Sequence, residues 1–250
     1  MRLHDRVILV TGAAKGLGRA MAEGMAAEGA AVMLADIDIA EAETVAAVIA
    51  QKGQRATAFN LDVSDGESVA RVVAAIQSRE GRIDVLVNNA GIAATKSFFD
   101  TSEAEWDRVM RINLKSVFHC CQAVLPAMTE RRRGKVINVA SVAAKVGGGL
   151  LGTTTYAASK AGMIGLSKGL AREFAPFGIT VNTIAPGSIT TPLTYQHMTP
   201  KQMAASVKRI PLGRRGTPED MVGAAVFLAS PESDFITGAT IDVNGGILMD

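Results

Sequence analysis

The alternation of short apolar runs with longer helix-like patterns is the feature that most constrains the fold of this chain. The apolar runs have the length of strands and lie at 7–10, 31–35, 56–61, 83–87, 136–139, 179–184 and 240–243. Helical spacing of apolar residues is found between them, at 16–28, 39–51, 66–78, 103–113, 117–131, 155–174 and 218–229. Near-continuous apolar strands separated by helices are typical of a parallel sheet covered on both faces. We therefore expect an α/β protein with a single doubly wound parallel sheet, a Rossmann fold, with helices on both faces.

The length and charge of the chain limit its organisation and its partners. Its 250 residues are 48% hydrophobic, and the alternation has no break, so we expect one domain over residues 1–250. Its 26 basic and 24 acidic residues give a formal net charge of +2, which offers no electrostatic basis for a nucleic-acid or membrane partner. The run Arg131-Arg132-Arg133 is the main local exception. We interpret it as the solvated end of a helix before Gly134 in preference to a docking patch.

The cysteines, histidines and apolar segments argue against disulfides, metal sites and membrane insertion. Cys120 and Cys121 are adjacent, and the three histidines are scattered, so we expect no disulfide framework and no metal site. The chain has no signal-like start and no uncharged apolar stretch near the ~18–20 residues that span a bilayer. We expect a protein of the reducing cytoplasm.

A glycine-rich turn follows the first apolar run. It reads Thr11-Gly12-Ala13-Ala14-Lys15-Gly16-Leu17-Gly18 and opens the first strand–turn–helix unit. Glycines in this position let the backbone approach a pyrophosphate, which rests on the positive end of the helix. The turn therefore predicts dinucleotide binding, although a purely structural strand–helix corner would look similar.

Asp36 and Lys15 bear on the choice of cofactor. Asp36 ends the second apolar run, where an acid can accept hydrogen bonds from the adenosine ribose hydroxyls and repel a 2′-phosphate. Lys15, in the glycine turn, could instead meet that phosphate. Because the carboxylate would lie against the 2′ position while a lysine can swing into solvent, we favour NAD over NADP. The alternative for Asp36 is a strand-end or helix-capping acid.

Tyr156 and Lys160 stand four residues apart in the pattern 155–174, so a helix would place them on one face. A cation beside a phenol favours its ionised form and lowers its pKa. Lowering a tyrosine pKa from about 10 to about 7, where proton transfer is most effective, requires roughly 4 kcal/mol. The pair is common on solvated helices, and it becomes an acid/base hypothesis only through the residues around it.

Two further polar residues fit this hypothesis. Ser141 follows the run 136–139, which places its hydroxyl at the carboxyl edge of the sheet, where ligands bind in such folds. Asn113 lies in a helical pattern although asparagine is a poor helix former, which indicates either a local kink or a functional contact.

Several independent motifs occur in one order along the chain. They are Thr11-Gly12-x3-Gly16-x-Gly18, Asn88-Asn89-Ala90-Gly91, Asn113, Ser141, Tyr156-x3-Lys160 and Pro186-Gly187. With them the sequence resembles the short-chain dehydrogenase/reductase family, in its compact form, over essentially the whole chain. The interval of fifteen residues from Ser141 to Tyr156 is longer than the family's usual interval of about thirteen, and the extra length falls in 146–152.

The resemblance implies a role for each matching residue. Tyr156 would be the general acid in reduction and the base in oxidation, and Lys160 would lower its pKa and hold the nicotinamide ribose. Ser141 would polarise the substrate oxygen, and Asn113 would support a water chain behind Lys160. Further cofactor contacts are implied at the adenine (Asp62 and Val63), along the cleft (Asn88, Ala90 and Gly91) and at the nicotinamide carboxamide (Ile189 and Thr191).

Substrate and assembly follow less directly from the residues. We expect a small secondary alcohol or ketone, with segment 190–213 as the substrate loop. An NADPH-dependent 3-oxoacyl-thioester reductase acting on an acidic carrier is the alternative, with Arg132 available to the carrier but Phe177 where a second cation would help. A non-catalytic dinucleotide sensor is a further alternative. The resemblance also implies a homotetramer built through the helices 117–131 and 155–174 and the C-terminal segment.

Overall fold

The computed structural model describes residues 1–149 and 153–249, the side chain of Leu193 apart. A seven-stranded parallel sheet in the order β3-β2-β1-β4-β5-β6-β7 runs through them. The strands are β1 (Val7–Thr11), β2 (Ala31–Asp36), β3 (Arg55–Asn60), β4 (Val85–Asn88), β5 (Gly134–Val139), β6 (Ile179–Pro186) and β7 (Thr240–Val243). This confirms the predicted doubly wound α/β fold.

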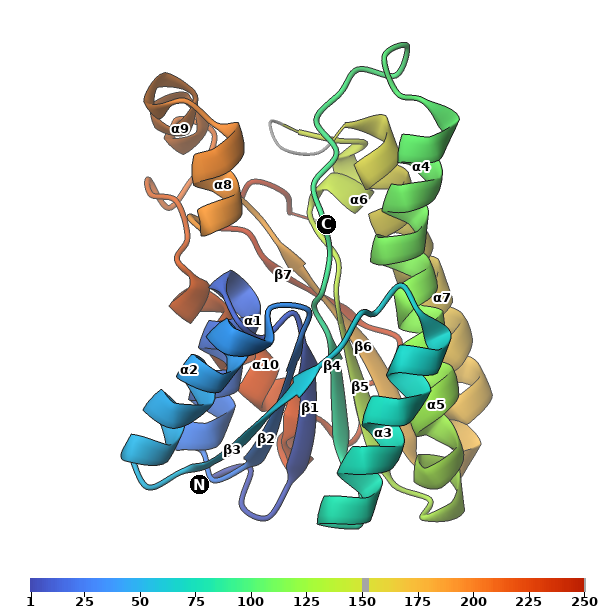
Figure 1. The fold of residues 1–250 in the computed structure, drawn as a ribbon. Helices are drawn as coiled ribbons and strands as arrows, with labels where there is room; N and C mark the ends of the chain where they lie inside the picture. The colour runs from blue at the N-terminus through green and yellow to red at the C-terminus, as the bar shows by residue number, and fades with distance from the viewer. Residues whose placement is uncertain (150–152, 250) are drawn as a thin grey trace.

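Helices cover both faces of the sheet (Figure 1). One face carries α1 (Gly16–Ala27), α2 (Ile39–Gln51) and α10 (Val222–Ala229). The other carries α3 (Gly66–Glu80), α5 (Ser116–Glu130) and α7 (Thr154–Phe174), with α4 (Glu103–Met110) beside α7. The remaining α-helices are short and lie together near one end of the sheet: α6 (Ala143–Val146), α8 (Pro192–His197) and α9 (Pro200–Val207).

The near-continuous apolar strands reflect two cores. In β1, Ile8 and Val10 pack into the core beneath α1 and α10, whereas Val7 and Leu9 pack into the core beneath α3 and α5. Alternate side chains of a strand point to opposite faces, so a strand buried on both faces has no polar position to reveal its alternation. Each fully buried aliphatic side chain of this size contributes about 1.5–3 kcal/mol to folding.

The strand order creates a crevice between β1 and β4. The chain runs outward from β1 through β2 to β3 and then returns to place β4 on the other side of β1. The two strands pair in parallel, with Val10 beside Val87, so the segments that follow them leave the sheet side by side. Ligands of open α/β sheets bind at such a reversal, outside the carboxyl ends of the strands.

Two segments differ in detail from the predicted elements. The patterns at 103–113 and 117–131 are joined by a π-helical turn, Arg111–Lys115, so the chain departs locally from α-helical geometry at Asn113. The segment 190–213, expected as the substrate loop, contains the short helices α8 and α9 and so is not irregular throughout. The loop 146–152 is described only through Gly149.

Candidate active site

Ser141, Tyr156 and Lys160 meet where β5 ends and α7 begins. Ser141 follows the last strand residue, Val139, by two positions, and Tyr156 lies in the first turn of α7. Lys160, one turn further, is 3% exposed, and its Nζ donates a 2.8 Å hydrogen bond to the carbonyl of Val139. The same Nζ lies 5.9 Å from the centre of the Tyr156 ring. This bond ties the tyrosine helix to the strand that carries the serine.

The electrostatics of Tyr156 differ from the expectation. Burial raises the pKa of Tyr156 above its ordinary value, and a hydrogen bond with the Ser141 side chain offsets part of that rise. Burial also lowers the pKa of Lys160 from 10.5 to about 8. The expected fall in the pKa of Tyr156 beside Lys160 is therefore absent from this structure, because desolvation of the phenol outweighs the other influences on it. At neutral pH the phenol carries its proton.

The Ser141 hydroxyl is oriented by the chain that follows it. Its oxygen accepts a 3.1 Å hydrogen bond from the backbone N–H of Ala143 and interacts with the Tyr156 side chain. A hydroxyl has one hydrogen to donate and two lone pairs. Ser141 and Tyr156 together can therefore supply two polarised O–H groups to a single substrate oxygen.

Asn113 is fully buried in the π-helical turn and links three segments. Its Oδ1 accepts from the N–H of Ile92 (2.8 Å), and its Nδ2 donates to the Ile92 carbonyl (3.0 Å) and to Ser159 Oγ (3.1 Å). Ser159 in turn donates to the Tyr156 carbonyl at 2.7 Å. A Cβ added to Gly91 would lie 3.1 Å from Asn113 Oδ1 and 3.5 Å from Lys160 Nζ, which shows how closely the three approach. Ser159 was not among the predicted residues, since a helix serine gives no signal in the sequence.

The glycine turn leaves room where a side chain would obstruct a ligand or the backbone. Gly12 has φ of +65°, and a Cβ there would lie 2.9 Å from the Cα of Ala90. A Cβ on Gly18 would lie 2.1 Å from the Gly12 carbonyl oxygen, closer than any real contact. Lys15 is the N-cap of α1, and its side chain makes no capping hydrogen bond. It therefore leaves the N–H groups of the first turn, including those of Gly16 and Leu17, uncovered. These features fit a dinucleotide pyrophosphate.

Asp36 faces this turn from the end of β2. Its Oδ2 accepts from the N–H of Ala14 at 2.9 Å, and its Oδ1 accepts from the N–H of Asp38 at 3.0 Å. A carboxylate has about four acceptor sites, so both oxygens retain capacity for ribose hydroxyls. Lys15 is paired with Asp38 at 2.8 Å, and both side chains are largely exposed. The hydrogen bond from Lys15 lowers the pKa of Asp38.

The two neighbouring asparagines after β4 have different roles. Asn88 is 3% exposed, and its Nδ2 donates to Asn138 Oδ1 at 2.8 Å, so its side chain points into the core. Asn88 could therefore line the cofactor cleft only through its backbone. Asn89 instead spans the crevice, with Nδ2 donating to the carbonyls of Thr11 and Gly12 at 3.0 Å. Thr11 Oγ1 accepts from the N–H groups of Asn89 and Ala90, so the two segments are held together.

The other predicted cofactor contacts lie at the ends of their strands. Asp62 and Val63 follow β3, and Asp62 Oδ1 accepts from the N–H of Ser64 at 2.8 Å. Thr191 lies opposite the glycine turn, since a Cβ on Gly16 would be 3.8 Å from Thr191 Cβ. The Thr191 hydroxyl also caps α8. Ile189 is 7% exposed.

Arg215 connects residues 189–190 to α9, and the sequence analysis did not predict this role. Its guanidinium donates to the Ile189 carbonyl (3.0 Å), to Thr190 Oγ1 (3.2 Å) and to Ser206 Oγ (3.0 Å). The segment after β6 is thereby tied to α9. Nothing in the sequence around Arg215 distinguishes it from its exposed neighbour Arg214, which pairs with Asp220.

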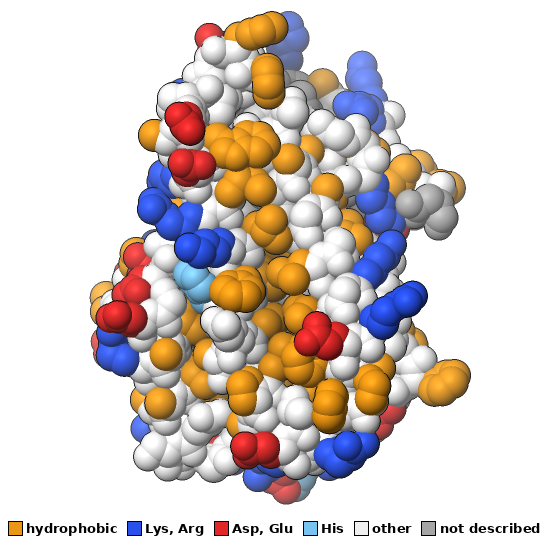
Figure 2. Space-filling model, turned by 90° about the vertical axis from the view of Figure 1, so that its right-hand side faces the viewer, with side chains coloured by type: hydrophobic (Ala, Val, Ile, Leu, Met, Phe, Trp, Pro, Cys, Tyr) orange, Lys and Arg blue, Asp and Glu red, His pale blue; other side chains and the backbone are white. Residues whose placement is uncertain are grey.

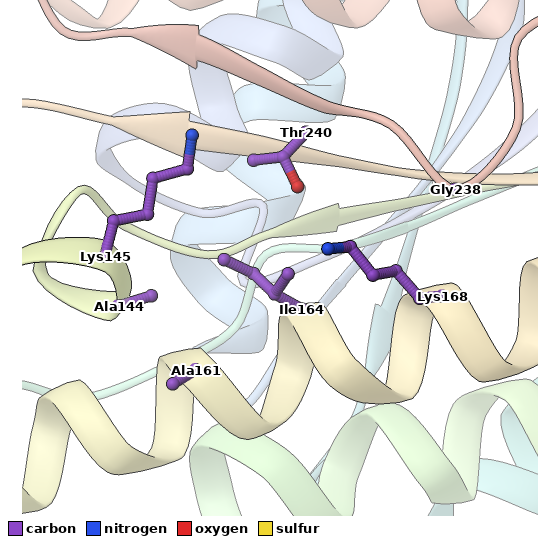
Figure 3. Close-up of a pocket in the computed structure, with 7 residues that line it drawn as sticks. All are labelled: Ala144, Lys145, Ala161, Ile164, Lys168, Gly238 and Thr240. Carbon is purple, nitrogen blue, oxygen red and sulfur yellow. The ribbon is translucent and has the colours of Figure 1, made fainter. Parts of the chain in front are cut away.

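One cavity lies near the site but is separate from it. It has a volume of about 400 Å³ and is lined by Ala144, Lys145, Ala161, Ile164, Lys168, Gly238 and Thr240. Figure 3 shows Lys145 and Lys168 extending toward Thr240 from opposite sides. Lys145 is paired with Asp242. Neither Ser141 nor Tyr156 lines this cavity, and we do not assign the substrate to it.

Metal-binding clusters and membrane-spanning helices were also sought. Within residues 1–149 and 153–249, no group of three or more His, Cys, Asp or Glu side chains is placed to hold a metal ion. No helix in the described part of the chain has the length and apolar character to cross a membrane.

The sequence was compared with protein families and characterised proteins. Residues 12–248 match the family described as "Enoyl-(Acyl carrier protein) reductase". The 3-oxoacyl-(acyl-carrier-protein) reductase FabG of Vibrio harveyi is 42% identical over 250 residues, which is all of both chains. The protein of the same name from Escherichia coli K12 is also 42% identical over the full length of both chains.

Solved structures show the same relationship. The structure of gox2181 superimposes with a TM-score of 0.95 at 35% identity, covering 98% of this chain and 96% of that one. A putative gluconate dehydrogenase from Agrobacterium tumefaciens gives a TM-score of 0.95 at 33% identity, covering 99% and 98%. The full-length sequence matches and the agreement in fold lead to one conclusion. The chain belongs to the short-chain dehydrogenase/reductase family and is an NAD(P)-dependent oxidoreductase acting on CH–OH groups.

Proposed function

We propose that this enzyme transfers a hydride between NAD(H) and a small secondary alcohol or ketone, with Tyr156 as general acid and base. The observation that carries the proposal is the convergence of Tyr156, Ser141 and Lys160 at the end of β5. The glycine turn fits a dinucleotide, which when bound supplies or accepts the hydride. The chain's own residues manage the proton and the substrate oxygen.

The proton steps follow from the geometry. In reduction, the Tyr156 O–H gives its proton to the substrate oxygen as hydride reaches the carbonyl carbon. In oxidation, the Tyr156 phenolate takes the hydroxyl proton as hydride leaves that carbon. Ser141 donates a hydrogen bond to the same oxygen and polarises the C–O bond. Lys160 holds positive charge near the phenol below its pKa of about 8, and Asn113 positions the Tyr156 turn through Ser159.

The preference for NAD rests on Asp36. Two backbone N–H groups fix its carboxylate beside the glycine turn, where it can accept from ribose hydroxyls and repel a 2′-phosphate. Lys15, the cation that could attract that phosphate, is already paired with Asp38. The remaining contacts of this proposal are Gly12, Gly16, Leu17, Gly18, Asp62, Val63, Ala90, Gly91, Ile189 and Thr191, with the backbone of Asn88.

Replacing Asp36 tests the choice of cofactor. In Asp36→Ala, NAD affinity should fall by about ten- to a hundredfold, the equivalent of losing hydrogen bonds to a charged group, while NADP affinity stays or rises. Lys15→Ala is the control and should change NAD affinity by less than about threefold, because its partner is an exposed acid. Affinities are measured by titration calorimetry. An unchanged NAD to NADP ratio in Asp36→Ala would show that the carboxylate does not face the ribose.

Replacing Tyr156 tests the chemistry. Tyr156→Phe removes the proton donor and little else, so turnover should fall by at least about a hundredfold while NADH still binds. The measurement is absorbance of reduced nicotinamide with a panel of secondary alcohols and ketones. Cofactor binding without turnover by the wild-type enzyme across the panel would instead favour a dinucleotide sensor.

A 3-oxoacyl-thioester reductase is the second candidate. The FabG proteins, 42% identical over the whole chain, carry that name. Arg132 could meet an acidic carrier, although its Nη2 is held by the Pro176 carbonyl at 2.6 Å and its guanidinium lies over the Phe177 ring. An assay with 3-oxoacyl thioesters and both cofactors separates the candidates: clear preference for the thioester with NADPH would replace the proposal above.

Location and organisation complete the proposal. Cys120 and Cys121 are adjacent, buried and free, and burial raises the pKa of Cys121 to about 12. Such thiols suit the reducing cytoplasm, where we place the protein. We further propose that residues 1–250 act as one cofactor-binding and catalytic domain, with 190–213 as its substrate loop.

A further inference from the structure

A second, basic cavity lies at the amino ends of the strands, opposite the predicted catalytic residues. It has a volume of about 270 Å³. Its lining residues precede β1, β4 and β5 and are His4, Asp5, Arg6, Arg82, Asp84, Arg131 and Arg133. Four arginines face two aspartates here, so the lining carries two positive charges in excess.

Two of the arginines are committed to structure. Asp84 Oδ2 accepts from the N–H of Val7 (2.9 Å) and from Arg82 Nε (3.0 Å), and its Oδ1 lies 3.6 Å from Arg131 Nη1. Arg82 also donates to the Asp5 carbonyl, and Arg131 to the Ile83 carbonyl, each at 2.6 Å. These contacts occupy the Asp84 carboxylate and connect the segments that line the base of the cavity.

The other two, Arg6 and Arg133, have no such partners. Arg6 is only 9% exposed, yet within the described residues its guanidinium makes no hydrogen bond and no ion pair within 4 Å. Arg133 is exposed at the rim and is likewise unpaired in that part of the chain. Asp234, a further acid whose charge acts on Arg6, is paired with Lys135 at 2.7 Å. Burial lowers the pKa of Arg6, and the charge of Arg133 adds to this.

No nitrogen of the Arg6 guanidinium is fully sealed from solvent, so the unpaired group opens onto the cavity, where an anion can pair with it. The planar fork of arginine matches the oxygens of a phosphate group, and two such forks can bind one group. The volume lies just below the ~300–1,000 Å³ typical of pockets for drug-sized ligands, so a small anion fits and a dinucleotide does not. We propose that Arg6 and Arg133 bind a phosphate group, free or as a small phosphomonoester, at a site separate from the active site.

The test is titration calorimetry of the intact protein with inorganic phosphate and with glycerol 3-phosphate, at constant ionic strength set with sodium chloride. The wild type should show saturable binding of one anion per chain. Arg133→Gln should weaken it at least about fivefold and Arg6→Met at least about tenfold. Arg108→Gln, an exposed arginine on α4, is the matched control and should bind as the wild type does. Tighter binding of glycerol 3-phosphate would identify a phosphomonoester as the natural ligand, and equal binding would identify the free anion.

If Arg6→Met fails to fold, Arg133→Gln still tests the proposal, because Arg133 is exposed at the rim of the cavity. Addition of NADH should leave phosphate binding unchanged, since the glycine turn lies at the other edge of the sheet. Displacement by NADH, binding that does not saturate, or equal affinity in Arg133→Gln and Arg108→Gln would each overturn the proposal.

Discussion

Lys160 is buried to an extent that is rare for a lysine. It is 3% exposed, and one neutral acceptor, the Val139 carbonyl, accepts from its Nζ. Burial without a carboxylate partner favours the neutral amine, which is why its pKa falls to about 8. The lysine that we propose supplies positive charge near Tyr156 is therefore buried at a cost to the stability of the fold.

That cost predicts a pH-dependent stability. Below pH 8 Lys160 is protonated in both states, and its burial penalises the folded state. Between pH 8 and 10.5 the unfolded state binds more protons, so the free energy of unfolding rises with pH. The wild type should gain up to about 3 kcal/mol relative to Lys160→Met between pH 7 and 10.5. Urea unfolding of both proteins across this range is the measurement, and a constant difference would contradict the low pKa.

The spacing of Tyr156 and Lys160 in the sequence predicted that they lie together, but it did not predict the direction in which the pKa of Tyr156 shifts. Tyr156 and Lys160 are four positions apart and share a face in any helix, so their spacing suffices to place them together. The direction of the pKa of Tyr156 depends on how much water the surrounding segments exclude, which no local pattern records. Asn88 and Asn89 make the same point, because only tertiary packing decides which of two adjacent amides faces the core.

At the scale of elements, the segment after β6 shows what sequence reasoning overlooked. Both α8 and α9 begin with Thr-Pro, at Thr191 and Thr199, and both have reciprocal capping bonds to the residue three positions on. Proline at the first helical position after a threonine cap is a recognised start signal. The helices are so short that apolar periodicity could not reveal them, and the start signals were the only local information.

The contacts of Arg215 predict that substrate binding depends on how this segment is held in place. Its guanidinium joins Ile189 and Thr190 to Ser206, so Arg215→Met should let α9 move relative to the proposed cofactor contacts. We expect KM for the substrate to rise about tenfold, or about 1.4 kcal/mol, with kcat changed by less than about threefold.

Arg214→Met is the matched control for this experiment. Arg214 pairs with Asp220 in an exposed position, and its loss should leave both kinetic constants near the wild-type values. Steady-state kinetics on the three proteins provide the comparison. A fall in kcat with constant KM in Arg215→Met would show that the residue does not act through the substrate loop.

For the whole molecule, the alternation of apolar runs predicted every strand of the sheet to within two residues at each end. The five inner strands β1, β2, β4, β5 and β6 are almost fully buried, which makes their apolar pattern strong, whereas the edge strands β3 and β7 are only partly buried. Because parallel crossovers are right-handed, the reversal of strand order at β1 places helices on both faces of the sheet. The basic cavity at the opposite edge could not be predicted, because its arginines come from three distant segments.

The surface of the whole molecule bears on the homotetramer that the family resemblance implies. Figure 2 shows apolar side chains gathered in the middle of the face formed by the right-hand helices of Figure 1. Phe118 of α5 is 47% exposed there, and α7 presents Ala161, Gly165 and Gly169 to solvent. A Cβ on Gly165 or Gly169 would meet nothing within 4 Å in this chain. Small residues permit close helix approach, so this face suits a second copy.

Gly165→Arg separates assembly from folding. The side chain has open space within one chain, so the fold should persist, whereas a copy packed on α7 would be displaced. Light scattering should give about four chains per particle for the wild type and a smaller particle for Gly165→Arg. Gly165→Ala is the control and should retain the wild-type mass. A monodisperse wild-type monomer would refute the proposed tetramer.

The carboxylate at the end of β2 has a consequence for protein engineering. Because Asp36 serves as acceptor for two main-chain N–H groups, it is part of the scaffold as well as a candidate selectivity filter. A designer who swaps it for an apolar side chain to change coenzyme usage also strips the N–H groups of Ala14 and Asp38 of their acceptor. A durable redesign would need a replacement such as asparagine or serine, together with release of Lys15 from Asp38.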